Sequence, residues 1–165
     1  MSGVVAARTM DSPIGPLRVS ASASGIREIR IGGGAGEAPV GAGVGALDLA
    51  ERELRAYFEG ARGVFTMARD AGGTEFQRDV WAALMEIPAG QTRSYADVAR
   101  AIGRPSAVRA VARANATNPL PIIVPCHRVI GSDGTLTGYG GGLAAKRWLL
   151  DHERRWWGAG LLVGV

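Results

Sequence analysis

The chain changes from strand-like to helical patterning along its length, and glycines mark the change. Three short segments alternate in the manner of strands, at residues 4–9, 17–23 and 26–31. A helical pattern follows over residues 47–58 and ends at Gly60. This first part of the chain therefore predicts a small antiparallel sheet plus one helix.

A glycine break at residues 71–73 divides the chain, and we place a domain boundary there. The predicted domains are an N-terminal sheet-plus-helix lobe, 1–73, and a mainly helical C-terminal lobe, 74–165. The predicted fold class is α/β of the α+β kind, with a helix-turn-helix in the second lobe. Seven glycines among the fourteen residues from Gly32 to Gly45 predict a loop.

The second lobe carries several helix signals. Thr74 and Gln77 have the spacing of a capping box, in which side chains satisfy the free amides at a helix start. Residues 94–102 and 105–116 predict two further helices, with the proline at the start of the second placed in its first turn. A turn containing Gly103 joins them, which is typical of a helix-turn-helix.

The second helix of this pair has two different faces. We expect Val108, Val111 and Ala112 to be buried. The other face is small and flanked by arginines, and comprises Ala107, Arg109, Ala110, Arg113, Ala114 and Thr117. Such a face can approach a nucleic-acid groove closely, and arginines pair with phosphate or replace a base in a stack. Tight packing on another helix is the alternative.

The positive charge is concentrated in the second lobe. Residues 1–73 carry eight basic and eight acidic side chains, whereas residues 74–165 carry eleven basic and seven acidic ones. This imbalance accounts for the net charge of +4. It favours a polyanionic partner such as nucleic acid, although a general bias toward arginine explains it equally well.

A single cysteine, Cys126, excludes an internal disulfide framework and a multi-cysteine metal cage. With only two histidines in the chain, we expect no metal site. No apolar run approaches the roughly 20 residues that a membrane helix needs. Residues 1–11 lack the pattern of a secretory signal, so we expect a cytoplasmic protein.

Cys126 follows an apolar run and precedes His127 and Arg128. A thiol is nucleophilic as thiolate, nearby cationic groups lower its pKa, and a histidine can accept its proton directly or through a water. Glu153 and Asp151 are both candidates to orient the histidine, and the spacing does not choose between them. A buried structural thiol is the alternative.

Two further residues and one glycine-rich segment are candidates to assist the cysteine or to bind a ligand. Asn118 precedes a proline and is either a turn residue or a polar brace behind the cysteine. Tyr95 faces the core by periodicity, but its hydroxyl could donate a proton at a pocket edge. The glycine-rich segment 138–142 contains Tyr139, and it either folds over a flat ligand or serves as a linker.

These residues together closely resemble the O6-alkylguanine-DNA alkyltransferases, which move an alkyl group from guanine to their own cysteine. The Pro-Cys-His-Arg-Val motif of that family stands intact at residues 125–129. Other similar segments are 90–95, 107–111, 118–119, 138–139 and 149–153. The resemblance covers about residues 74–153, and the first 73 residues match only in outline.

The resemblance implies a role for each matching catalytic position. Cys126 is the implied alkyl acceptor, His127 its base through a water, and Glu153 the residue that holds the histidine. Asn118 is implied to brace the cysteine turn, and Tyr95 to donate a proton to the departing guanine. Each molecule would act once, because a thioether has no leaving route.

The resemblance also implies double-stranded DNA as the partner, bound through its minor groove with the alkylated base flipped out. Arg109 would fill the space of that base. The other implied DNA contacts are Thr92, Ser94, Ala107, Ala110, Arg113, Ala114 and Arg128. The implied base pocket is lined by Tyr95, Val129, Tyr139 and Gly140. No cofactor is implied, and we expect a monomer that can assemble cooperatively on DNA.

The sequence departs from the family in places and leaves other functions open. Some members hold zinc in the first lobe, but this chain has no cysteine or histidine there. Residue 140 is glycine where some members have serine, which bears on the alkyl groups accepted. The tail, residues 156–165, has no family role. The alternatives are a lesion-binding protein without transfer, a thiol hydrolase and a helix-turn-helix regulator.

Overall fold

The structure is a computed structural model, and it describes residues 3–33 and 41–158. Its contacts divide the chain into two compact units, residues 1–72 and 73–165. Gly72 and Gly73 at the division have φ values of 66° and 89°, a conformation that glycine adopts without steric cost. Most of the glycine-rich loop, 34–40, and the end of the tail, 159–165, lie outside the described residues.

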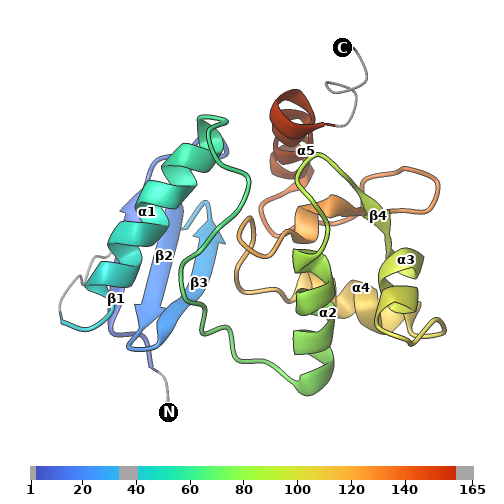
Figure 1. Cartoon of the computed structure of the whole chain (residues 1–165), viewed down its shortest axis with the longest axis horizontal. Coiled ribbons are helices and arrows are strands. Elements are labelled where there is room, and N and C mark those ends of the chain that lie inside the picture. The colour runs from blue at the N-terminus through green and yellow to red at the C-terminus, as the bar shows by residue number, and fades with distance from the viewer. Residues whose placement is uncertain (1–2, 34–40, 159–165) are drawn as a thin grey trace. The chain divides into compact units, whose positions relative to one another are not determined.

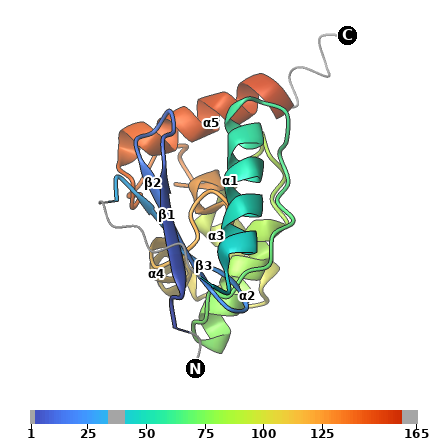
Figure 2. The same cartoon turned by 90° about the vertical axis from the view of Figure 1, so that its left-hand side faces the viewer.

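The first unit is a three-stranded antiparallel sheet covered by one helix. Its elements are β1 (Ala6–Met10), β2 (Leu17–Ser22), β3 (Gly25–Ile31) and α1 (Val44–Phe58). The strands follow one another in the order β1-β2-β3, and α1 runs along one face of the sheet (Figures 1 and 2). The helix buries Leu47, Leu54 and Tyr57 against that face, as the amphipathic pattern predicts.

A buried carboxylate organises the chain after α1. Glu53 is only 1% exposed and accepts hydrogen bonds from the backbone N–H groups of Thr66 and Met67, at 2.9 and 3.1 Å. Arg62 pairs with it at 3.0 Å. These partners satisfy a charge that would otherwise be costly to bury, and they hold the segment that returns the chain beside β3, where Ile26 bridges to Arg69.

The second unit is mainly helical, as expected. Its elements are α2 (Glu75–Met85), β4 (Arg93–Ser94), α3 (Tyr95–Ala101), α4 (Val108–Ala116), a 3₁₀ turn (Cys126–Arg128), β5 (Val129–Ile130) and α5 (Leu143–Trp157). Helices α2, α3 and α4 pack on one another, and α5 contacts the 3₁₀ turn (Figure 1). The two short strands pair in parallel. The chain therefore has the mixed α+β fold that its patterning predicts.

Two capping boxes begin helices in this unit. Thr74 accepts from the backbone N–H of Gln77 and its own N–H donates to the Gln77 side chain, as the spacing predicts. Ser94 and Asp97 make the same reciprocal pair at the start of α3, which sequence analysis missed. Because Ser94 is thereby the N-cap of α3, the first residue of the helix is Tyr95.

The start and the faces of α4 differ from the prediction. The helix begins at Val108, and Pro105 lies in the preceding turn, where Ala107 N–H bonds to the Arg104 carbonyl. Val108 and Ala112 are half-buried instead of buried. Ala114, expected on the open face, is 3% exposed, because this side of α4 packs on α2 and its carbonyl accepts the Trp81 indole N–H at 2.9 Å.

No helix within residues 3–33 and 41–158 is long and apolar enough to cross a membrane. Nor do those residues bring together three or more metal-ligating side chains.

Candidate active site

The backbone segment directly before the cysteine is strained. Ile122 has a φ of 76°, and it is the only described residue other than glycine with a positive φ. Such a conformation is costly for a β-branched residue and persists only where its surroundings enforce it. Three residues later Pro125, at φ −80° and ψ 63°, forms an inverse γ-turn, in which Cys126 N–H bonds to the Val124 carbonyl at 2.8 Å. Cys126 thus opens the 3₁₀ turn and is 5% exposed.

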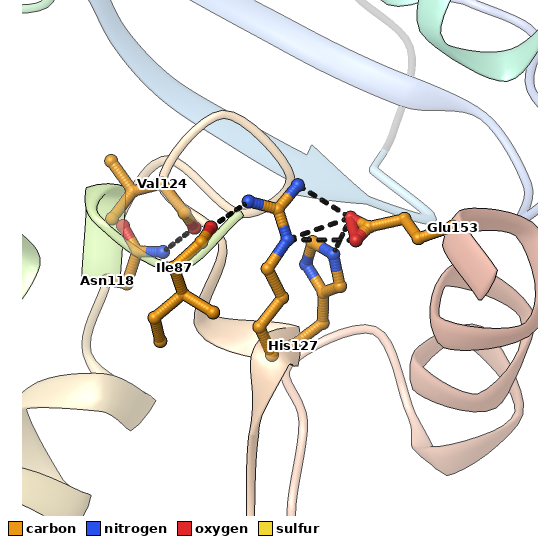
Figure 3. Close-up of polar contacts among 6 residues, drawn as sticks. Ile87, Asn118, Val124, His127 and Glu153 are labelled. Carbon is orange, nitrogen blue, oxygen red and sulfur yellow. Dashed lines mark hydrogen bonds and ion pairs between the residues drawn. The ribbon is translucent and has the colours of Figure 1, made fainter. Parts of the chain in front are cut away.

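Asn118 braces this segment from behind. Its side-chain amide donates to the Val124 carbonyl at 2.8 Å, and its side-chain oxygen accepts from Leu120 N–H at 2.9 Å (Figure 3). It also hydrogen-bonds to the Cys126 side chain, which lowers the pKa of the thiol, as does the charge of Lys146. Burial is the larger influence, however, and the pKa of Cys126 is raised. The thiol therefore needs a base.

His127, the middle residue of the cysteine turn, forms a buried pair with Glu153 of α5. The His127 Nε2 atom lies 2.6 Å from Glu153 Oε1, and the two residues are 0% and 1% exposed (Figure 3). The other candidate acid, Asp151, is exposed and pairs with Arg154 at 3.0 Å. The other histidine, His152, stacks on Trp148. Of the three neighbouring candidates on α5, it is therefore Glu153, and not Asp151 or His152, that contacts the imidazole of His127.

The electrostatics of this pair favour a neutral imidazole. Burial lowers the pKa of His127 despite the opposing charge of Glu153. Burial alone would raise the pKa of Glu153, but His127 and Arg128 lower it to about 2. A neutral His127 with Nε2–H donating to the carboxylate carries its lone pair on Nδ1. That buried atom has no hydrogen-bond partner within the described part of the chain, so it can accept a proton.

These pKa values predict that acid destabilises the protein. Glu153 has a pKa of about 2 in the folded chain against its ordinary 4.5, so the unfolded chain binds a proton first as the pH falls. The contribution of Glu153 is therefore complete above about pH 5 and is lost progressively toward pH 2, whereas that of His127, whose pKa burial lowers, is already being lost as the pH falls below its ordinary 6.5. Urea unfolding at pH 7, 5, 4 and 3 checks this. Glu153→Gln should flatten the dependence, and an unchanged slope in that variant would contradict the assignment.

Arg128 does not lie on a DNA-binding surface, contrary to the expectation from the sequence. It is 5% exposed, and its guanidinium donates to both carboxylate oxygens of Glu153, from Nε at 2.8 Å and from Nη2 at 2.7 Å. A third bond, at 2.6 Å, runs from Nη1 to the Ile87 carbonyl. The 3₁₀ turn directs this side chain inward, where it holds the carboxylate that holds His127.

Sequence analysis missed Lys146, which is the only lysine of the chain. It is fully buried on α5, and its ammonium donates to the carbonyls of Val129 and Thr137 at 2.8 and 3.0 Å. Burial lowers its pKa, and the opposing influence of Cys126 raises it. The sequence did carry a signal for this residue: it is a single lysine in a chain with eighteen arginines, and it stands on the apolar face of its helix.

A second missed residue, Asn115, connects α4 to the cysteine turn. Its side-chain amide donates to the Cys126 carbonyl at 3.4 Å, and the residue is 5% exposed. Its side-chain oxygen is buried and has no partner among the described residues. The helix with the arginine-flanked face thus touches the residue that carries the thiol.

Two tyrosines are implied by the family resemblance to line the base pocket. Tyr95, expected to face the core, is half-buried, and its hydroxyl lies 2.6 Å from the Thr137 hydroxyl. The Tyr139 hydroxyl is buried without a partner in the described ranges. Burial, with the charges of Cys126 and Glu153, holds the pKa of Tyr139 well above its ordinary value, so it stays a donor. Val129 is fully buried, and Gly140 is exposed.

The predicted helix-turn-helix is formed by α3 and α4, which pack on each other. Thr92 before it and Arg109 and Arg113 on α4 are exposed, whereas Ala107 and Ala110 are half-buried. The hydroxyl of Ser94, another expected DNA contact, is engaged in capping α3. The structure therefore leaves two arginines and small residues open on one side of α4.

Together the fold and the site define a protein with a helix-turn-helix unit and a free, buried cysteine followed by a histidine that pairs with a glutamate. A model of the DNA-binding domain of 6-O-methylguanine DNA methyltransferase matches residues 75–155. Proteins named methylated-DNA–protein-cysteine methyltransferase are similar over most of the chain. That of Mycobacterium bovis is 48% identical, over 89% of this chain and 91% of its own, and that of Methanosarcina barkeri 44%, over 87% and 94%.

Solved structures agree with the sequence comparison. The O6-methylguanine methyltransferase of Mycobacterium tuberculosis superposes with a TM-score of 0.81 at 45% identity, over 96% of this chain and 98% of that one. The Mycobacterium tuberculosis OGT in complex with DNA gives 0.82 at 47% identity, over 94% and 96%. The chain belongs to the methylated-DNA–protein-cysteine methyltransferase family.

Proposed function

We propose that the protein repairs DNA by moving the alkyl group of O6-alkylguanine irreversibly onto Cys126. The observation that carries this proposal is the buried thiol in an intact Pro-Cys-His-Arg-Val motif, whose next residue is a neutral His127 held by Glu153. A buried thiol with a raised pKa is inert without a base, and this arrangement supplies one. Family membership supports the same activity.

The proposed chemistry is a single displacement. His127 Nδ1 accepts the thiol proton, directly or through a water, and the imidazolium that forms is stabilised by Glu153. The sulfur then forms a bond to the alkyl carbon as the bond from that carbon to the guanine oxygen breaks. Tyr95 donates a proton to the departing guanine. No cofactor enters this balance, because the substrate brings the transferred group, and the thioether product ends the activity of that molecule.

Recognition of DNA is assigned to α4. Its exposed Arg109 and Arg113 suit phosphate contact or insertion into the base stack, and Ala107 and Ala110 let the helix approach a groove. The alkyl group is out of reach within the stack, so we propose that the base is flipped out. Tyr139, whose buried hydroxyl is an available donor, lines its pocket in this proposal. With chromosomal DNA as the substrate, the cytoplasm is the proposed location.

Mass spectrometry tests the proposal directly. The protein is mixed with duplex DNA containing O6-methylguanine, and the masses of the intact protein and of its proteolytic peptides are measured. We expect Cys126 to gain the mass of one methylene group, once per molecule, and unmodified duplex to cause no change. An unchanged mass with bound DNA would instead indicate a lesion-binding protein. Repeated turnover on ester substrates without DNA would indicate a thiol hydrolase.

A further inference from the structure

Thr137 joins two elements at the edge of the active site. Its hydroxyl lies 2.6 Å from the Tyr95 hydroxyl on α3, and its carbonyl accepts the Lys146 ammonium of α5 at 3.0 Å. The residue itself lies outside any helix or strand and is exposed. The backbone of Thr137 is thus held by a buried lysine, and its hydroxyl is held by the hydrogen bond with Tyr95.

Lys146, which holds the backbone of Thr137, also holds the segment that follows the nucleophile. Lys146 also donates to the Val129 carbonyl at 2.8 Å, and Val129 directly follows the turn that begins with Cys126. Val129 pairs in turn with Arg93 of β4, two residues before Tyr95. A closed series of bonds thus connects the phenol to the turn that holds the thiol, and Thr137 is the link at the phenol.

We propose that Thr137 is a positioning residue for the proton donor, an inference that rests on the proposed function. As the C–O bond of the substrate breaks, the electron pair passes to the guanine, which takes the proton of Tyr95. The phenol oxygen then carries negative charge and needs a donor. The Thr137 hydroxyl, already within 2.6 Å, supplies that hydrogen bond, which strengthens as the charge develops. Solvent later returns a proton to Tyr95, since the pair is exposed.

Replacement of Thr137 by valine, which keeps its shape and removes its hydroxyl, tests this role. The readout is the single-turnover rate of methyl transfer at saturating duplex containing O6-methylguanine. We expect Thr137→Val to slow transfer about tenfold, a part of what a positioned acid contributes. Affinity for the same duplex should be unchanged. Thr137→Ser, which retains a hydroxyl, should recover most of the rate.

The chain offers a matched control and a stricter test. Thr135 lies in the same segment and bonds through its hydroxyl to Asp133 at 2.7 Å, away from Tyr95, so Thr135→Val should transfer at the wild-type rate. If Thr137 acts through Tyr95, then Thr137→Val should add no further loss to Tyr95→Phe.

The outcomes separate this inference from the proposed function. A wild-type protein that transfers no methyl group refutes the function, and the inference with it. A wild-type protein that transfers normally, beside an equally fast Thr137→Val variant, overturns the inference alone. So would a Thr135→Val variant as slow as Thr137→Val, or losses that multiply in the double variant, because either shows a general effect of the segment.

Discussion

Cys126→Ser should lose methyl transfer completely while it keeps its fold and its affinity for DNA. Serine has nearly the shape of cysteine, so the buried turn that holds the side chain can accommodate it. The hydroxyl does not ionise as a thiol does, and it lacks the nucleophilicity of a thiolate. Because nucleophile and base act as one unit, removal of the thiol should leave no transfer to detect.

The variant is measured by the mass shift of the protein after prolonged incubation with duplex containing O6-methylguanine. Fluorescence anisotropy of the labelled duplex and thermal unfolding provide the controls for binding and folding. Cys126→Ala is the matched variant, and it should bind the duplex equally well. Detectable transfer by Cys126→Ser, or methylation of any other residue in the wild-type protein, would refute the assignment of the nucleophile.

Arg128→Met should produce the largest loss of stability among single ionic substitutions in the second unit. The guanidinium is 5% exposed, and it satisfies both oxygens of Glu153 and the Ile87 carbonyl. Methionine fills part of the volume but leaves a buried carboxylate beside a neutral histidine and a carbonyl without its donor. Breaking such a pair typically costs about 3–5 kcal/mol in the free energy of unfolding.

A matched substitution on the surface makes this test specific. Arg154 lies on α5 and pairs with Asp151 at 3.0 Å, with side chains that are 72% and 60% exposed. Exposed pairs contribute about 0–1 kcal/mol, so Arg154→Met should barely move the urea midpoint. A comparably small effect of Arg128→Met would contradict a buried ionic role and would return Arg128 to the candidates for DNA contact.

The salt dependence of DNA affinity distinguishes an arginine that stabilises the fold from one that contacts DNA. An arginine that contacts phosphate reduces the salt dependence of DNA affinity when it is replaced. We assign that behaviour to Arg109 and Arg113, which are exposed on α4, and none of it to Arg128. The helix-turn-helix regulator, the remaining alternative, requires operator sequence preference instead of preference for an alkylated base.

Local chemistry in the sequence determined much of the architecture. The reciprocal spacing of Thr74 and Gln77 fixes a helix start within four residues, and the structure has that capping box. Alternation before residue 32 and helical spacing after it predicted the sheet and the helices. Cys126 and His127 are adjacent in the chain, so their proximity needs no tertiary information, and the motif around them carried the family resemblance.

Only the tertiary structure decided where individual side chains point. Asp151 and Glu153 lie two residues apart, and the direction in which α5 meets the cysteine turn brings Glu153 to His127. The same turn sends Arg128 inward, although its charge suggested a partner outside the protein. Lys146 and Thr137 join the site through segments far from Tyr95 in the sequence. Patterns of spacing report which face of its own element a residue occupies, whereas the partner on that face is set by long-range packing.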